Sequence, residues 1–187
     1  MRDLVVTENI TLDGVIDASE GWFGPAGSDE RGDGADLAAV QAEHRDGADA
    51  VLLGRRTYEE FAGYWPARDD DLTGVAEYLN RTRKYVLSST LRDPMWAGTT
   101  VLGGPLADEV AALKAQPGKA IVATGSIRLV TALVRSGLVD EYRLFVYPTV
   151  LGRGRRLFED ANGPRPLRLV ETRAFESGIA LLRYRCD

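Results

Sequence analysis

The fold of this chain is decided by Leu53-Gly54-Arg55-Arg56-Thr57-Tyr58-Glu59-Glu60-Phe61 (residues 53–61). Residues 50–53 are an apolar run that predicts a buried strand, and residues 58–61 begin a helical pattern. A strand therefore passes through Gly54 into a helix start, where we expect Thr57 to cap the helix. Free N–H groups at such a start favour an anion, and Arg55 and Arg56 add forked cationic donors. The stretch predicts a phosphate site; a tight turn with a solvated arginine pair is the alternative.

The same unit of strand, small-residue turn and helix recurs further along the chain. Residues 84–87 form an apolar strand that ends at Ser88 and Ser89, which either bind a ligand or cap a turn. Residues 119–123 lead into Thr124-Gly125-Ser126, and Ser126 is expected to cap a helix over residues 127–135. In open α/β sheets ligands bind at the carboxyl ends of strands, so these turns are candidate ligand sites.

The remaining segments complete an α/β pattern. Helical spacing predicts helices over residues 36–45, 75–80 and 106–115, and a strand is expected over residues 99–102. After Asp140 the pattern changes to alternating strands at residues 141–147, 167–175 and 179–185, with a hairpin at residues 176–178. We therefore predict a mostly parallel sheet with helices on both faces, an antiparallel C-terminal hairpin and a single domain over residues 1–187.

Composition excludes several classes of protein. The net charge of −5 argues against an extended nucleic-acid surface, and no stretch is long and apolar enough to span a bilayer. The N-terminus lacks the pattern of a signal peptide, and Cys186 is the only cysteine, so we expect a cytoplasmic protein without an internal disulfide.

Few side chains are available for catalysis. His44 is the only histidine, so neither a zinc site of His and Cys ligands nor a Ser-His-acid triad can be assembled without it, and no metal is expected. His44 itself lies in a polar helical stretch and is interpreted as a surface residue. Chemistry carried by a bound cofactor is the natural alternative.

These motifs, in this order, resemble the dihydrofolate reductase-like superfamily, and most closely the branch containing the reductase domain of bacterial riboflavin synthesis (the RibD C-terminal domain). The resemblance covers nearly the whole chain. It is carried by residues 11–14, 53–59, 86–89, 125–126 and 133, 137–141, 148, 151–152 and 157–158. It implies a three-layer α/β/α fold with NADPH as the hydride donor.

The resemblance assigns the cofactor residues one by one. Arg55 would meet the adenosine 2′-phosphate, and Arg56 and Thr57 the pyrophosphate. The strand end with Leu87, Ser88 and Ser89 would meet the adenosine ribose and its phosphate. The cofactor-binding residues are therefore expected to be Gly54, Arg55, Arg56, Thr57, Leu87, Ser88, Ser89, Thr124, Gly125, Ser126 and Ile127, the last three holding the pyrophosphate at a helix start. Thr124 departs from the glycine that many relatives have.

Each candidate proton-donor or substrate-binding residue has a structural alternative. Asp36 resembles the early helical carboxylate of folate reductases and is the candidate proton donor, with Asp33 or Asp29 as substitutes and a helix N-cap as the structural alternative. Asp13 either contacts a polar substrate or makes a turn. Trp22 either lines the substrate pocket or anchors its loop. Arg153, Arg155 and Arg156 form a basic loop that either holds a substrate phosphate or is solvated.

Together these features predict an NADPH-dependent reductase that transfers hydride to a pyrimidine or pterin-type substrate. The activity is expected to be similar to that of 5-amino-6-(5-phosphoribosylamino)uracil reductase. Dihydrofolate reduction is the alternative within enzymes, and a non-catalytic NADPH-binding protein is the alternative outside them. The family also implies a homodimer.

Overall fold

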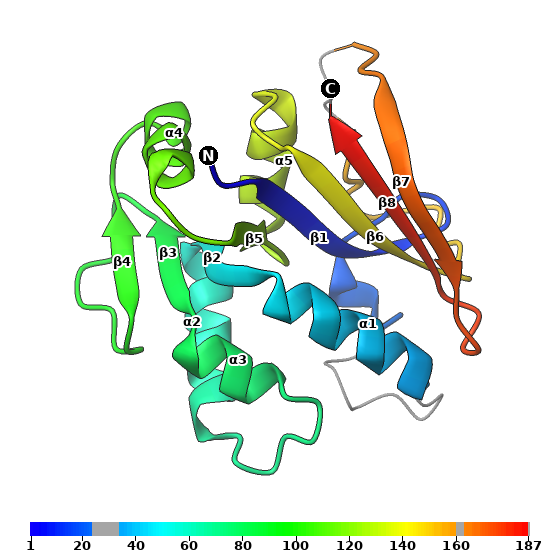
Figure 1. Ribbon diagram of the computed structural model, residues 1–187, viewed down its shortest axis with the longest axis horizontal. Coiled ribbons are helices and arrows are strands. Elements are labelled where there is room, and N and C mark those ends of the chain that lie inside the picture. The colour runs from blue at the N-terminus through cyan, green and yellow to red at the C-terminus, as the bar shows by residue number, and fades with distance from the viewer. Residues whose placement is uncertain (24–33, 160–162, 187) are drawn as a thin grey trace.

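The computed structural model describes residues 1–23, 34–159 and 163–186. Its centre is an eight-stranded sheet in the order β4-β3-β2-β5-β1-β6-β8-β7 (Figure 1). The strands are β1 (Leu4–Thr11), β2 (Ala48–Gly54), β3 (Arg83–Leu87), β4 (Thr99–Leu102), β5 (Ala120–Ala123), β6 (Glu141–Tyr147), β7 (Leu167–Ala174) and β8 (Ala180–Cys186). Neighbouring strands are parallel from β4 to β6, whereas β8 is antiparallel to both β6 and β7. The predicted mostly parallel sheet with an antiparallel C-terminal hairpin is confirmed.

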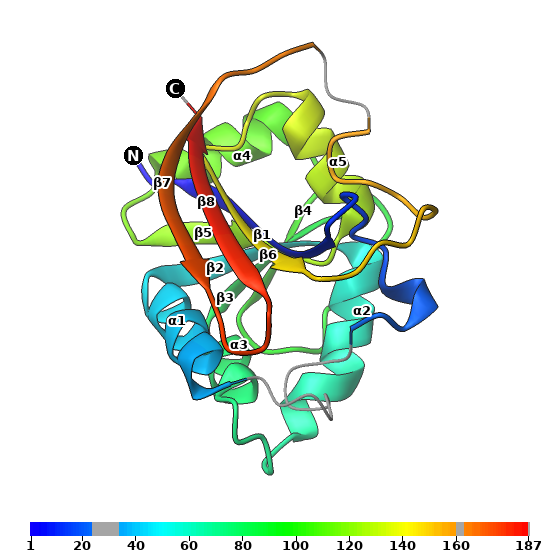
Figure 2. The same cartoon turned by 90° about the vertical axis from the view of Figure 1, so that its right-hand side faces the viewer.

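One face of the sheet is covered by helices α4 (Leu106–Ala115) and α5 (Ile127–Arg135) (Figure 2). Val110 and Leu113 of α4 and Leu133 of α5 pack with Leu4 and Val6 of β1 in the largest apolar cluster. Both helices have the predicted bounds, because helical spacing stops at the breakers Pro117-Gly118 and Gly137, and α5 also has a clear apolar stripe.

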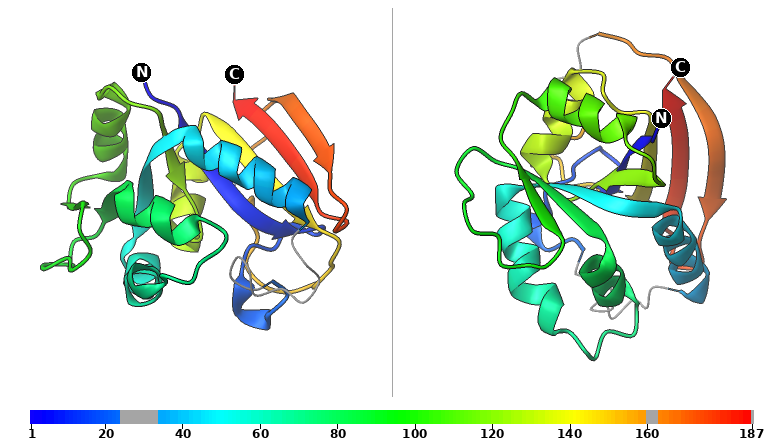
Figure 3. Two further views of the ribbon diagram at one scale, coloured as in Figure 1. Left: turned by 60° about the horizontal axis from the view of Figure 1, so that its bottom comes forward. Right: turned by 60° about the vertical axis from the view of Figure 1, so that its left-hand side comes forward.

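The opposite face carries α1 (Ala35–Asp46), α2 (Arg55–Tyr64) and α3 (Val75–Arg81), with short 3-10 turns at Ala18–Glu20 and Trp65–Ala67 (Figure 3). Two separate clusters form there. Residues of α2 and α3 pack on β2 and β3, whereas Leu37 and Val40 of α1 pack on Phe145, Phe175 and Leu181 near the C-terminal hairpin. The two clusters leave the central strands between them less densely covered, and this is where the site lies.

Two expected helix caps, Thr57 and Ser126, and the alternative interpretation of Asp36 as an N-cap were wrong. Helix α2 begins at Arg55 with Gly54 as its N-cap, so Thr57 lies inside the first turn. Helix α1 begins after Gly34, so Asp36 is not the N-cap, and the side chain of Ser126 does not cap α5. Each of the three side chains hydrogen-bonds instead to a segment that is distant in sequence. Local propensity is overridden here by contacts between segments that are distant in sequence.

Lys84 is a fully buried cation in β3. Its Nζ donates to the carbonyl oxygens of Thr82 at 2.8 Å and Ala97 at 3.0 Å, and it lies 4.6 Å from the centroid of the Trp96 ring. Burial lowers the pKa of Lys84. The side chain thus joins the α3–β3 connection to the segment that precedes β4.

We expect Lys84→Met to destabilise the fold by about 1–3 kcal/mol, because the carbonyl groups that Lys84 serves would stay buried without their donor. Urea denaturation measures the change. Lys119→Met is the matched control, since Lys119 is exposed and its Nζ donates to the carbonyl oxygen of Asp46 at 2.6 Å. Equal stability of the two variants would contradict this role for Lys84.

Candidate functional site

Two glycine turns meet at the carboxyl ends of β2 and β5. The Gly54 N–H donates to the Ser126 hydroxyl at 2.9 Å, and the Thr57 hydroxyl donates to the Gly125 carbonyl oxygen at 3.4 Å. Gly125 has a φ of +64°, a conformation that favours glycine, and it is exposed. The starts of α2 and α5 are therefore held side by side, and a helix start is a favourable place for an anion. At α5 the N–H groups of Ser126 and Ile127 donate to the Thr124 and Gly125 carbonyl oxygens, at 2.7 and 3.2 Å.

A buried carboxyl group lies beneath this pair of turns. Glu8 of β1 is 5% exposed, and its Oε1 accepts from the Gly125 N–H at 2.8 Å. Burial raises the pKa of Glu8 to about 8, against the smaller lowering effect of the Gly125 hydrogen bond. The carboxyl group is thus mostly protonated at neutral pH and positions the backbone of the turn.

The two arginines of the first turn face solvent. The side chains of Arg55 and Arg56 are 52% and 90% exposed, and they pair with Glu59 at 3.3 Å and Glu60 at 3.0 Å, one helical turn away. Exposed pairs of this kind are weak, so both guanidinium groups are free to exchange their partner for a phosphate.

A shallow second hollow of about 320 Å³ continues the same edge toward β3 and β4. It is lined by Leu87, Ser88, Ser89, Thr90, Leu102, Gly103 and Gly104. The Ser88 hydroxyl accepts from the Thr90 and Leu91 N–H groups at 3.1 and 3.0 Å, so it caps a turn, as the alternative interpretation predicted. The Ser89 side chain stays exposed at the rim.

A cavity of about 660 Å³ opens between α1 and α2 on the face opposite α5. Its floor is formed by the central strands β1, β5 and β6, and Thr57, Thr124 and Gly125 of the glycine turns border it. The walls are mostly aromatic and apolar, and they include Phe23, Val51, Phe61, Tyr64, Trp65, Val75, Tyr78, Leu79, Val122 and Phe145. A flat ring held there would lie next to the glycine turns and largely away from water.

Asp36 does not line this cavity. Its carboxylate accepts from the Leu37 N–H at 2.8 Å and from the Glu176 N–H at 3.0 Å, which ties the start of α1 to the β7–β8 hairpin. The alternatives Asp29 and Asp33 lie outside the described residues. Among the cavity residues, the buried carboxyl group is that of Glu8.

Asp13 holds a loop together. Its carboxylate accepts from the Thr11 hydroxyl at 2.7 Å and the Gly152 N–H at 2.8 Å, and Arg156 lies 3.4 Å away. The hydrogen bond from Thr11 contributes most to lowering the pKa of Asp13 to about 2. Arg155 pairs with Asp17 at 3.4 Å. Asp13 and two arginines of the basic loop are thus engaged with each other or with neighbouring loops, and they do not border the cavity.

Trp22 anchors its loop. It is 6% exposed, its Nε1 donates to the Asp17 carbonyl oxygen at 2.7 Å, and its ring meets the Tyr147 ring edge-on. The neighbouring Phe23 lines the cavity instead. Trp22 thus has the anchoring role that the sequence allowed for it, and the cavity-lining role belongs to Phe23.

The expectation of a surface histidine was wrong. His44 is half-buried and lines the cavity, with its ring centroid 6.0 Å from that of Phe145. Burial, followed by the nearby charges of Arg143 and Arg183, lowers the pKa of His44 to about 4, so the ring is neutral at pH 7. Leu37, Val40 and His44 recur at helical spacing, which is the signal that places His44 on the inward face.

Neither a metal site nor a membrane span emerges from the described ranges. Over residues 1–23, 34–159 and 163–186, no group of three His, Cys, Asp or Glu side chains is arranged to hold a metal ion. None of the helices described there is long and apolar enough to cross a bilayer.

Glu8→Gln tests the buried carboxyl group, because glutamine keeps the acceptor for the Gly125 N–H and does not ionise. A raised pKa favours the protonated form in the folded state, so this contribution to stability is complete below about pH 4.5 and is lost as the pH rises toward about 8. We expect the free energy of unfolding of the wild type to fall relative to Glu8→Gln by about 1.4 kcal/mol per pH unit across that window.

Denaturant titrations at several pH values measure this difference. Glu60→Gln is the control, since Glu60 also borders the cavity but its side chain is 59% exposed. Parallel pH profiles for wild type and Glu8→Gln would show that Glu8 is not protonated in the fold.

Comparisons with known proteins identify the family of the chain. The family model described as the RibD C-terminal domain matches residues 2–181. The chain is 30% identical over 185 residues to the uncharacterized protein YyaP of Bacillus subtilis (strain 168), covering 98% of this chain and 94% of that protein. It is 28% identical over 183 residues to the uncharacterized protein YwjB of the same organism, covering 96% of each.

Solved structures share the fold. A putative riboflavin biosynthesis protein from Shewanella sp. PV-4 matches with a TM-score of 0.70 and 18% identity over 99% of both chains. A diaminohydroxyphosphoribosylaminopyrimidine deaminase/5-amino-6-(5-phosphoribosylamino)uracil reductase from Thermotoga maritima matches with a TM-score of 0.67 and 18% identity, over all of this chain but 57% of that one. With the family model matching residues 2–181, this chain belongs to the RibD C-terminal domain family.

Proposed function

We propose that this protein is an NADPH-dependent reductase that transfers hydride to a pyrimidine or pterin-type substrate, with an activity similar to that of 5-amino-6-(5-phosphoribosylamino)uracil reductase. One observation carries the proposal: the glycine turns and the aromatic cavity share a border at Thr57, Thr124 and Gly125. A dinucleotide whose diphosphate lies on the turns can therefore extend its nicotinamide into the cavity. The bound cofactor would supply the hydride.

The residues present fit such a cofactor. The glycine turns offer two helix starts, Arg55 and Arg56 are exposed beside them, and the hollow at Ser88 and Ser89 lies farther along the same edge. Arg55 is suited to a 2′-phosphate, because a guanidinium group binds a dianion through paired donors. Thr124 is accommodated as a wall residue of the cavity.

Few groups of the chain are needed for the chemistry. The aromatic walls would hold a planar substrate against the nicotinamide and exclude water, which supplies proximity and orientation. The carboxyl group of Glu8 would hold the Gly125 turn, and with it one end of the cofactor. The assignment of Asp36 as proton donor receives no support from its position at the hairpin.

We also propose the homodimer that the family implies. Strand β7 is an edge of the sheet, and Leu169 and Val170 on it are 50% and 39% exposed. An edge strand with exposed apolar side chains is a suitable surface for a second copy of the chain.

The cofactor preference is tested with Arg55→Ala. We expect NADPH binding to weaken by about tenfold to a hundredfold, the value of a charge-assisted hydrogen bond to phosphate, while NADH binding changes little. Calorimetric titration of both nucleotides measures the two affinities. Arg81→Ala is a matched control, because Arg81 is exposed and pairs with Glu77 one helical turn away, as Arg55 pairs with Glu59. Equal weakening of NADPH and NADH would contradict the assignment.

The reaction is tested by following NADPH absorbance with 5-amino-6-(5-phosphoribosylamino)uracil and, separately, with dihydrofolate. Turnover of the first compound is expected. Turnover of dihydrofolate alone would establish the folate alternative, and NADPH binding without turnover of either would favour the non-catalytic one.

A further inference from the structure

The inner wall of the cavity contains a cation with spare hydrogen-bonding capacity. Arg143 of β6 lines the cavity, and its side chain is 9% exposed. Its Nε donates to Glu141 at 2.7 Å, but its Nη1 is buried and meets no hydrogen-bond partner among the residues that the structure describes. A buried guanidinium donor without an acceptor is costly, so such a group calls for a ligand.

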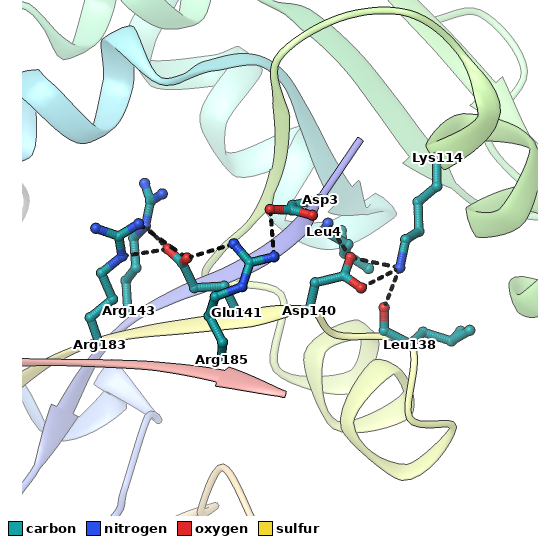
Figure 4. A network of polar contacts seen from close by, with 9 residues as sticks. All are labelled: Asp3, Leu4, Lys114, Leu138, Asp140, Glu141, Arg143, Arg183 and Arg185. Atoms are coloured by element: carbon teal, nitrogen blue, oxygen red, sulfur yellow. Dashed lines mark hydrogen bonds and ion pairs between the residues drawn. The ribbon is translucent and has the colours of Figure 1, made fainter. Parts of the chain in front are cut away.

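The surrounding charges leave Arg143 incompletely neutralised. Glu141 is 1% exposed and is shared by three arginines, Arg143, Arg183 and Arg185 (Figure 4). Arg183 and Arg185 each have a second carboxylate, Glu171 at 3.6 Å and Asp3 at 3.0 Å. Arg143 has only its share of Glu141 among the ion pairs of the described chain, so of these three arginines it is the one without a second carboxylate.

His44 contributes a second polar side chain to this wall of the cavity. Its Nδ1 is also buried without a hydrogen-bond partner in the described part of the chain. Burial, followed by the positive charges of Arg143 and Arg183, lowers the pKa of His44, so the ring stays neutral and leaves the positive charge at this wall to arginine. His44 and Arg143 line the same cavity, and a neutral imidazole with its hydrogen on Nδ1 would add a second donor for an anionic oxygen group.

We propose that Arg143, assisted by His44, binds an anionic oxygen group of the substrate, either a carboxylate or an ionised ring oxygen, and thereby makes the cavity selective for anionic heterocycles. The aromatic walls require the rest of the ligand to be flat. The interpretation of the cavity as a substrate site rests on the proposed function. The anion preference is a property of the apo cavity and is measured without turnover.

The test compares three pyrimidines of similar size by equilibrium dialysis, with and without NADPH. Uracil is neutral, orotate carries a carboxylate, and barbiturate carries its charge on the ring oxygens. We expect wild type to bind at least one of the two anions about tenfold or more tightly than uracil, the value of one charge-assisted hydrogen bond. The anion that binds more tightly identifies the kind of oxygen group.

Arg143→Met should abolish this preference, and Arg143→Lys should restore part of it. Glu141 keeps Arg183 and Arg185 in both variants, so its charge stays paired and the fold is expected to persist. Arg185→Met is the matched control, because it removes a cation from the same cluster but Arg185 does not line the cavity. The control should retain the preference of the wild type.

Two kinds of result would overturn the proposal, one in the wild type and one in the variants. One is equal binding of uracil and both anions by wild type, or binding of none of them. The other is an anion preference that survives in Arg143→Met or is lost equally in Arg185→Met. NADPH binding without any anion preference would refute this inference alone, whereas an Arg143-dependent preference without NADPH binding would refute the proposed cofactor alone.

Discussion

The hydrogen bond from the Gly54 N–H to the Ser126 hydroxyl joins two turns that are 72 residues apart in sequence. Its formation depends on β2 and β5 being adjacent and parallel, so that their carboxyl ends meet at one edge of the sheet. Both helix starts are thereby placed together, and the cavity opens beside them. The architecture of the candidate site is thus a consequence of strand order, refined by a few side-chain contacts.

Periodicity and breakers were sufficient to predict most of the fold. Helices α4 and α5 have clear stops, α5 also has a strong apolar stripe, and the glycine turns mark the carboxyl ends of strands β2 and β5. The side chains at the turns were harder to predict, because a hydroxyl or carboxylate near a helix start has several possible partners. Thr57 and Ser126 contact the opposite turn instead of their own helices, and Asp36 contacts a hairpin 140 residues later.

The cavity residues were mostly missed for a related reason. Glu8 and Arg143 are charged residues within strands, and sequence alone does not reveal which face of the sheet is covered by which helix. His44 was available from helical spacing, since it follows Leu37 and Val40 on one face. Its neutrality, however, depends on burial and on arginines contributed by β6 and β8, which only the assembled sheet brings close to it.

Strand β8 lies inside the sheet, between β6 and β7, although it is the last strand in sequence. Phe175, Ile179 and Leu181 from this region pack against α1, and Arg183 shares Glu141 with Arg143. During synthesis, β1 through β6 emerge from the ribosome while this neighbour is still missing, which leaves an apolar sheet edge exposed. The α1 side of the cavity is consequently completed last, after the strands that carry the two glycine turns have been synthesised.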